Sequence, residues 1–141
     1  MGDNVSLSCN NLVIVKHPEK GDENNGKLIC DEIRGSLAEK AGQVCIFHDA
    51  THMSWANSAY AGAFKELNKD LEGRVVEVVC AIPGSIPRMM ACTVAMFSDL
   101  KWSIFKTKDE AKHHLGQKGF NLHSLPSEDA GQKRLVNIVV K

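Results

Sequence analysis

The segment from His48 to Phe64 carries side chains that can do chemistry: histidines, an aspartate and several hydroxyls lie close together. Nucleophilic catalysis requires a serine or cysteine activated by a nearby base, and Ser58 with His52 would supply such a pair in a hydrolase. His48 and Asp49 lie close by in the sequence. Because the chain has no G-x-S-x-G motif, we expect no catalytic residue and keep the hydrolase as an alternative.

A metal site in this segment would use His48, Asp49 and His52 as ligands. Their spacings of one and three residues differ from zinc templates, and the sequence has no Cys-x-x-Cys pair to complete them. The cysteines are odd in number and scattered, which favours small core residues in a reducing compartment. They are Cys9, Cys30, Cys45, Cys80 and Cys92. Phosphate-binding glycine motifs are also absent, so we expect neither a metal nor a cofactor.

A helix is predicted to begin at Asn57 or Ser58, directly after a strand and a short loop. Unpaired backbone amides and the helix dipole favour an anion at such a position. Phosphorylation of Ser58 would add roughly −1.5 to −2 charges there, enough to change a docking surface. Alternatively, Asn57 or Ser58 only caps the helix, and local chemistry alone favours this simpler interpretation.

Hydrophobic periodicity and turn residues position these side chains within alternating elements. In chain order they predict a hairpin or interrupted strand over 4–16, a loop over 17–26, a helix over 27–41, a strand over 43–49, a helix over 58–71, a strand over 74–82, a buried helix over 85–99, a strand over 101–106 and a helix over 107–116. A polar connection over 119–133 then leads to a C-terminal edge strand, LVNIVV.

This alternation predicts a single α/β domain spanning 1–141, with a mainly parallel or mixed sheet of four to six strands. Lys plus Arg and Asp plus Glu number 17 each, so no net field attracts nucleic acid. The longest apolar stretches fall well short of the roughly 20 residues that span a bilayer. We therefore expect a cytoplasmic protein with no nucleic-acid partner and no membrane span.

The segment from Asp49 to Gly62 resembles the signature of the STAS domain, the fold of bacterial anti-sigma-factor antagonists. Asp49 corresponds to an aspartate at a strand end and Thr51 to a hydroxyl residue in the following loop. Residues 57–60 fall on the family's Asp-Ser-Ser-Gly, with Asn57, Ala59 and Tyr60 departing from it, and Gly62 matches a second glycine. Ser58 takes the position of the serine that is phosphorylated in the family.

A second resemblance lies later in the chain, where SIPRMMACTVAMF and KWSIFKTKDEAKHHL look like divergent bacterial STAS-like proteins. Pro87-Arg88-Met89 falls on their Val-Arg-Met segment. The two resemblances together cover about residues 10 to 118 and imply a STAS fold.

Our leading hypothesis is a non-enzymatic regulatory module that docks a protein partner, for example a kinase-like anti-sigma factor. The resemblance implies a docking site made of Ser58, Asn57, Asp49, Thr51, Ala61 and Gly62. The module is also considered as a homodimer.

A second alternative is a small-molecule or lipid carrier whose adaptable pocket would be lined by Met89, Met90, Met96 and Phe97. The competing interpretation is that this apolar helix completes the core.

Three further residues, Arg88, His48 and His52, are candidate contacts for a ligand or partner. Arginine is costly to bury alone, so we expect Arg88 to pair with Glu77 or Asp99. If it is exposed instead, it would meet an acidic partner.

Overall fold

The computed structural model describes residues 11–39, 41–120 and 136–140, with backbone only for Asn11 and 136–140. The part of the predicted hairpin before residue 11, and the predicted connection from residue 121 onward, lie outside the described residues. In chain order the elements are β1 (Asn11–Lys16), β2 (Lys20–Gly21), α1 (Glu23–Ala38), β3 (Val44–Asp49), β4 (Trp55–Ala56), α2 (Ser58–Leu71), β5 (Val75–Ala81), α3 (Ser85–Met96), β6 (Trp102–Phe105), α4 (Lys108–Gln117) and β7 (Val136–Val140).

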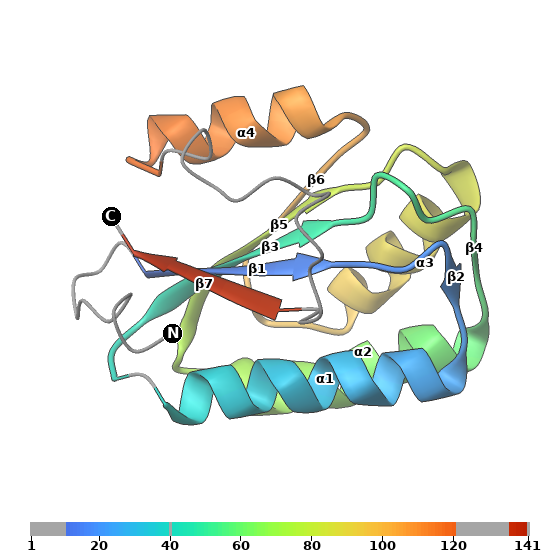
Figure 1. Ribbon diagram of the computed structural model, residues 1–141, viewed down its shortest axis with the longest axis horizontal. Helices are drawn as coiled ribbons and strands as arrows, with labels where there is room; N and C mark the ends of the chain where they lie inside the picture. Colours follow the sequence, from blue (N-terminus) through green and yellow to red (C-terminus); the bar gives the residue numbers. More distant parts are fainter. Residues whose placement is uncertain (1–10, 40, 121–135, 141) are drawn as a thin grey trace.

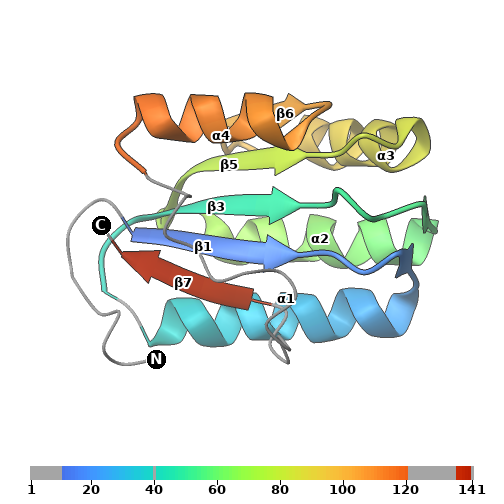
Figure 2. The same ribbon diagram turned by 45° about the horizontal axis from the view of Figure 1, so that its top comes forward.

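The main sheet has the strand order β6-β5-β3-β1-β7. β1, β3, β5 and β6 pair in parallel, and β7 runs in the opposite direction beside β1 at the edge of the sheet (Figure 2). This arrangement confirms the predicted α/β class with a mainly parallel sheet. The two short strands β2 and β4 pair with each other and form a separate ribbon.

The helices cover the two faces of the sheet unequally. Figure 1 shows α4 on one side of the sheet and α1 and α2 on the other. The larger hydrophobic core joins the sheet to α1, α2 and α3, and includes Ile46 and Phe64. The smaller core joins the opposite face to α4 through Phe47 and Leu115.

β3 is buried along its whole length, and its side chains alternate between the two cores. The last two residues of the strand follow the same alternation. The ring of His48 lies against Phe64 of α2, whereas the carboxylate of Asp49 lies against Lys108 of α4. Two polar residues that are adjacent in sequence therefore serve different faces of the sheet.

The start of α1 corrects the sequence prediction. α1 begins at Glu23, because the side chain of Asp22 caps it by accepting a hydrogen bond from the amide of Asn25 at 2.9 Å. The predicted start at Lys27 is wrong because the apolar periodicity begins only after this polar first turn. α1 also ends at Ala38, before the predicted residue 41.

Other boundary signals behave as the sequence predicts. Thr107 and Glu110 form the expected capping box at the start of α4. Gly42 and Gly73, in the turns after α1 and α2, have φ angles of 84° and 81°, a region that glycine adopts without steric cost.

The prediction that the helix after β5 is buried is wrong. α3 buries Pro87 and Val94, while Met89 and Met96 are exposed. The reason is that α3 packs against the rest of the molecule along one side, and no described element covers its outer side. Apolar composition alone cannot distinguish a core helix from an uncovered one.

Two glycines allow the ring of Tyr60 to lie close to α1 and the β2–β4 ribbon. A Cβ placed at Gly21 would lie 2.9 Å from Cγ of Tyr60, and one placed at Gly26 would lie 3.1 Å from its Cδ1. At Gly35, later in the same helix as Gly26, a Cβ would meet nothing within 4 Å.

We predict opposite outcomes for one substitution at two positions of α1. Gly35→Ala should raise the free energy of unfolding by about 0.5–1 kcal/mol, because alanine favours the helix. Gly26→Ala should leave the protein about 1–3 kcal/mol less stable than Gly35→Ala, since the new methyl crowds Tyr60. Urea unfolding of both variants measures the difference, and equal stabilisation would contradict close packing at Gly26.

Candidate functional site

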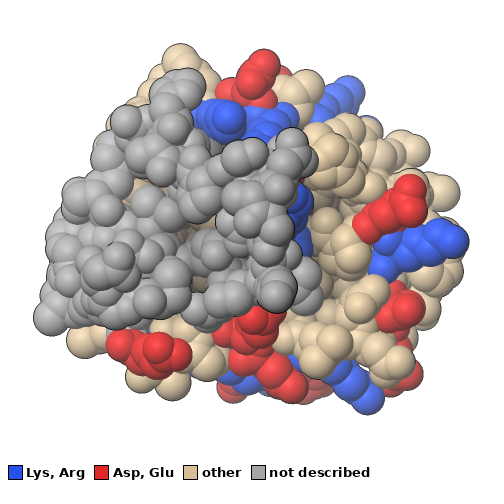
Figure 3. All heavy atoms as spheres, viewed as in Figure 1, with Lys and Arg blue, Asp and Glu red and all other residues tan. Residues whose placement is uncertain are grey.

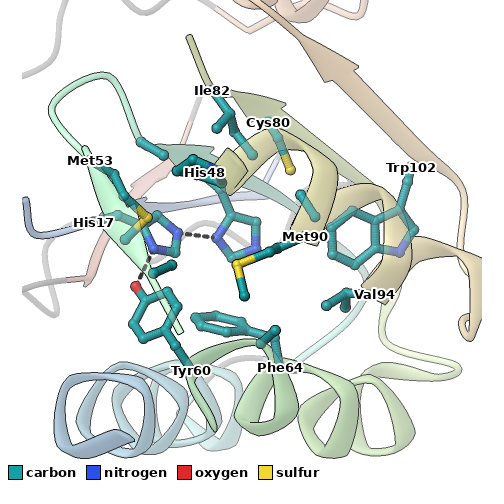
Figure 4. A pocket seen from close by; sticks show the side chains of 15 residues that line it. His17, His48, Met53, Tyr60, Phe64, Cys80, Ile82, Met90, Val94 and Trp102 are labelled. Carbon is teal, nitrogen blue, oxygen red and sulfur yellow. Dashed lines mark hydrogen bonds between the residues drawn. The ribbon is translucent and has the colours of Figure 1, made fainter. Parts of the chain in front are cut away.

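A pocket opens between the carboxyl ends of β3 and β5 and the helices α2 and α3 (Figure 4). Its empty space, about 500 Å³ with the part open to solvent included, leaves about 60 Å³ for the centres of water-sized molecules. Its walls are mainly apolar, with Phe64 from α2, Met90 from α3 and Trp102 from β6. Such concave apolar sites with few polar groups are typical of small-molecule binding.

Three polar side chains of this pocket form one hydrogen-bonded chain, shown by dashed lines in Figure 4, whereas the indole Nε1 of Trp102 has no hydrogen-bond partner among the described residues. The hydroxyl of Tyr60 lies 2.5 Å from Nδ1 of His17, and Nε2 of His17 lies 2.8 Å from Nδ1 of His48. We call His17 and His48 the histidine pair. Phe64 lies against both rings, with centroid distances of 5.5 and 5.6 Å.

The parallel pairing of β1 with β3 creates the histidine pair. In this register Val15 is opposite His48 and Lys16 is opposite Asp49. The amide of His17 then donates to the carbonyl of Asp49 at 2.9 Å, which continues the strand pairing by one residue. His17 is thereby held beside His48, although 31 residues separate them in sequence.

Burial keeps both histidines neutral at neutral pH. It lowers the pKa of His17 from 6.5 to about 4. Burial and the neighbouring His17 lower the pKa of His48 well below 6.5. Burial also raises the pKa of the Tyr60 hydroxyl, so all three groups are uncharged near pH 7.

Of the docking residues implied by the STAS resemblance, four lie together at the start of α2. Asn57 caps the helix, its side chain accepting from the amide of Tyr60 at 2.9 Å. Ser58 is exposed as the first residue of the helix. Ala61 is half-buried in the pocket wall, and Gly62 lines a groove between α1 and α2.

The other two residues of that set lie on the opposite face of the sheet. The carboxylate of Asp49 accepts hydrogen bonds from the amide and the hydroxyl of Thr51, and lies 2.9 Å from Nζ of Lys108. Burial alone would raise the pKa of Asp49, but the bonds from Thr51 and Lys108 outweigh it and lower the pKa. Asp49 therefore anchors the loop after β3 to α4.

The hydrolase pair is not assembled. His52 is exposed in the turn after β3, and Ser58 makes no hydrogen bond to it within the described part of the chain. The geometry thus gives the hydrolase alternative no support. In the same described ranges, no three His, Cys, Asp or Glu side chains gather closely enough to hold a metal ion.

Arg88 does not pair with Glu77 or Asp99, which corrects the sequence expectation. Its guanidinium donates to the carbonyls of Ile82 and Pro83 at 3.1 and 2.9 Å, so it caps the carbonyls left after β5. Glu77 lies on the other face of the sheet and is engaged there.

Glu77 is a nearly buried carboxylate in β5 that collects partners from β6 and α4. It accepts hydrogen bonds from Ser103 at 2.6 Å and His114 at 2.8 Å, and lies 3.0 Å from Nζ of Lys118. Burial would raise the pKa of Glu77, but these bonds outweigh it and lower the pKa. This cluster fixes α4 to the sheet.

Sequence reasoning missed His17, which it assigned to a loop, and Trp102, which it treated only as part of a strand. It identified His48 as a candidate ligand contact, and His48 lies in the pocket wall. No local signal marks His17, because its role depends on the pairing of two strands far apart in sequence.

Comparisons of the chain with protein-family models, curated proteins and solved structures find no match. None of the helices within the described ranges is long and apolar enough to cross a membrane. Charges of both signs are interspersed on the face seen in Figure 3, in keeping with equal numbers of acidic and basic residues. The function must therefore be inferred from the pocket and the surface around it.

We predict that the histidine pair makes stability fall as pH falls below 6.5. In this range the unfolded chain takes up protons that the folded protein does not accept, because burial holds the pKa of His17 at about 4. Over the full range the loss from His17 amounts to about 3 kcal/mol, at about 1.4 kcal/mol for each pKa unit.

Urea unfolding from pH 6.5 down to about 5 measures this loss before most carboxylates titrate. The double variant His17→Phe with His48→Phe should show a flatter dependence on pH. His113→Gln, on the exposed side of α4, serves as the control and should keep the wild-type slope. A double variant with the wild-type slope would refute the buried neutral pair.

Proposed function

We propose that the protein is a non-enzymatic regulatory module that docks a protein partner on α2 and α3. The observation that carries the proposal is the exposed apolar face of α3. Four large side chains at its start and end are between 62% and 81% exposed, and we call them the α3 patch: Ile86, Met89, Met96 and Phe97. Their spacings of three, ten and eleven residues from the first place them on one side of the helix.

A contiguous group of large apolar side chains on a surface usually marks an interaction site. Methionine side chains suit this role because they are flexible and polarizable. Within the patch, the hydroxyl of Thr93 donates to the carbonyl of Met89 at 3.1 Å, so its polar group is turned back to the helix. The patch therefore favours a partner that presents apolar side chains.

A positive charge at the border of the α3 patch indicates what chemistry the partner's surface should have. Nζ of Lys65, on α2, lies 4.5 Å from the centre of the Phe97 ring. A carboxylate on the partner could pair with this amine while apolar side chains cover Phe97. We infer a partner surface that combines apolar anchors with an acidic residue.

The STAS resemblance adds a regulatory role and a location for it. Ser58 is exposed at the start of α2, the helix that packs beside α3. By that resemblance the partner would be a kinase-like anti-sigma factor in the cytoplasm, and phosphorylation of Ser58 would control docking. A second copy of the chain is the competing occupant of the α3 patch.

We predict that Met89→Glu and Phe97→Glu each weaken partner binding at least about tenfold, which corresponds to about 1.4 kcal/mol. A charge placed in an apolar contact must lose its hydration when the partner binds. Leu28→Glu is the matched control, since Leu28 is 58% exposed on α1 and should bind as wild type.

The partner is first captured from native lysate with wild type and then purified for calorimetric titration against each variant. Circular dichroism checks that the variants are folded. A partner that binds all four proteins equally would exclude the α3 patch as the docking surface. If wild type sediments as a dimer and Met89→Glu as a monomer, the occupant of the α3 patch is a second copy of the chain and not another protein.

We predict that Ser58→Asp has opposite effects on stability and on partner binding. No acidic residue occupies the first turn of α2, so an aspartate there should raise the free energy of unfolding by about 0.3–1 kcal/mol through the helix dipole. The same charge should weaken binding of an acidic partner. Ser58→Ala, as the control, should bind as wild type. Tighter binding by Ser58→Asp would contradict the proposed regulation.

A second candidate function, small-molecule carriage, is favoured by the apolar pocket itself. Of the residues that the sequence suggested for such a pocket, Met90 lies in its wall, while Met89, Met96 and Phe97 belong to the exposed α3 patch. The carrier hypothesis is therefore supported by a pocket, but most of the residues that line it differ from those that the sequence suggested.

A further inference from the structure

We propose that the pocket binds an uncharged aromatic molecule that carries one hydrogen-bond acceptor, and that Nε2–H of His48 donates to this acceptor. The inference rests on the second candidate function, carriage in the pocket, and is independent of docking on the α3 patch. Its basis is the order of protons along the chain formed by Tyr60 and the histidine pair.

The hydroxyl of Tyr60 decides this order. His17 is the one hydrogen-bond partner of the Tyr60 hydroxyl among the described residues, and Tyr60 is 4% exposed. If Nδ1 of His17 carried a proton, the buried hydroxyl proton would have no acceptor, which is costly. The hydroxyl therefore donates to Nδ1 of His17.

The remaining protons follow from neutrality. A neutral imidazole carries one N–H, so the proton of His17 is on Nε2 and donates to Nδ1 of His48. The proton of His48 must then be on its own Nε2. Among the described residues this N–H has no acceptor. The series of hydrogen bonds from Tyr60 through His17 therefore ends at an unpaired donor on His48.

The position of this donor points to a ligand. The edge of the His48 ring opposite His17 faces the interior of the pocket, towards Met90 and Val94 (Figure 4). Apolar side chains surround it, so no protein group replaces the missing acceptor. A ligand atom with a lone pair, such as a carbonyl oxygen, would satisfy this donor.

The side chains of the pocket wall determine which shape and charge of ligand fit best. The ring of Trp102 is nearly parallel to that of His48, at an interplanar angle of 9° and a centroid distance of 6.2 Å. Phe64 and Met90 add aromatic and polarizable surface. Because both histidines are neutral and the walls are apolar, a charged ligand would lose its hydration without compensation. The best complement is a flat uncharged ring with a carbonyl-type acceptor.

The test compares acetophenone with α-methylstyrene, which has the same shape but a methylene group in place of the carbonyl oxygen. Wild type should bind acetophenone about three- to tenfold more tightly, the usual worth of one buried hydrogen bond. Titrations followed by backbone amide NMR shifts give both affinities and show whether the shifts map to residues around His48. His48→Phe should bring the ratio close to one, and Leu28→Glu should keep it.

A measurement on the unaltered protein keeps the proposal testable if His48→Phe fails to fold. Long-range ¹H–¹⁵N spectra of the histidine rings should show both His17 and His48 with the proton on Nε2. A proton on Nδ1 of His48 would overturn the proposal.

Three results of the titration would also overturn it, and they differ in what they exclude. Equal binding of the two probes would retain a carrier pocket but remove the acceptor from the ligand class. Shifts confined to the α3 patch, or binding of neither probe, would remove carriage as well and leave docking of a protein partner untouched.

Discussion

The parallel pairing of β1 with β3 is the constraint on which the site depends. It places the residue after β1 beside the penultimate residue of β3, so His17 meets His48. The alternation of side chains along β3 then sends His48 to the pocket and Asp49 to α4. A shift of the register by one residue would exchange these two side chains between the faces and abolish the pocket's polar chain.

The two faces of the sheet use polar groups in contrasting ways. On the α4 face, Asp49 and Glu77 are ionised and paired with cations, and they tie a single helix to the sheet. On the other face the histidine pair is neutral and sits among apolar side chains. Charged groups therefore attach a helix on the α4 face. On the pocket face, neutral hydrogen-bonding groups line the space where a ligand would bind.

The sequence predicted the features that depend on local signals. The capping box at Thr107 and the strand–helix alternation needed only residues a few positions apart. Two errors have other causes. The prediction that α3 is buried was wrong because an apolar helix has the same sequence pattern whether protein or solvent covers it. His17 was missed because its partners lie 31 and 43 residues away, and only strand register and the packing of α2 bring them together.

The close approach of Gly21 and Gly26 to Tyr60 links the pocket to a distant part of the chain. The hydroxyl that sets the proton positions of the histidine pair is carried on a ring packed against the β2–β4 ribbon and the first turn of α1. Because the ribbon and the start of α1 lie so close to this ring, their packing fixes where the Tyr60 hydroxyl sits in the pocket.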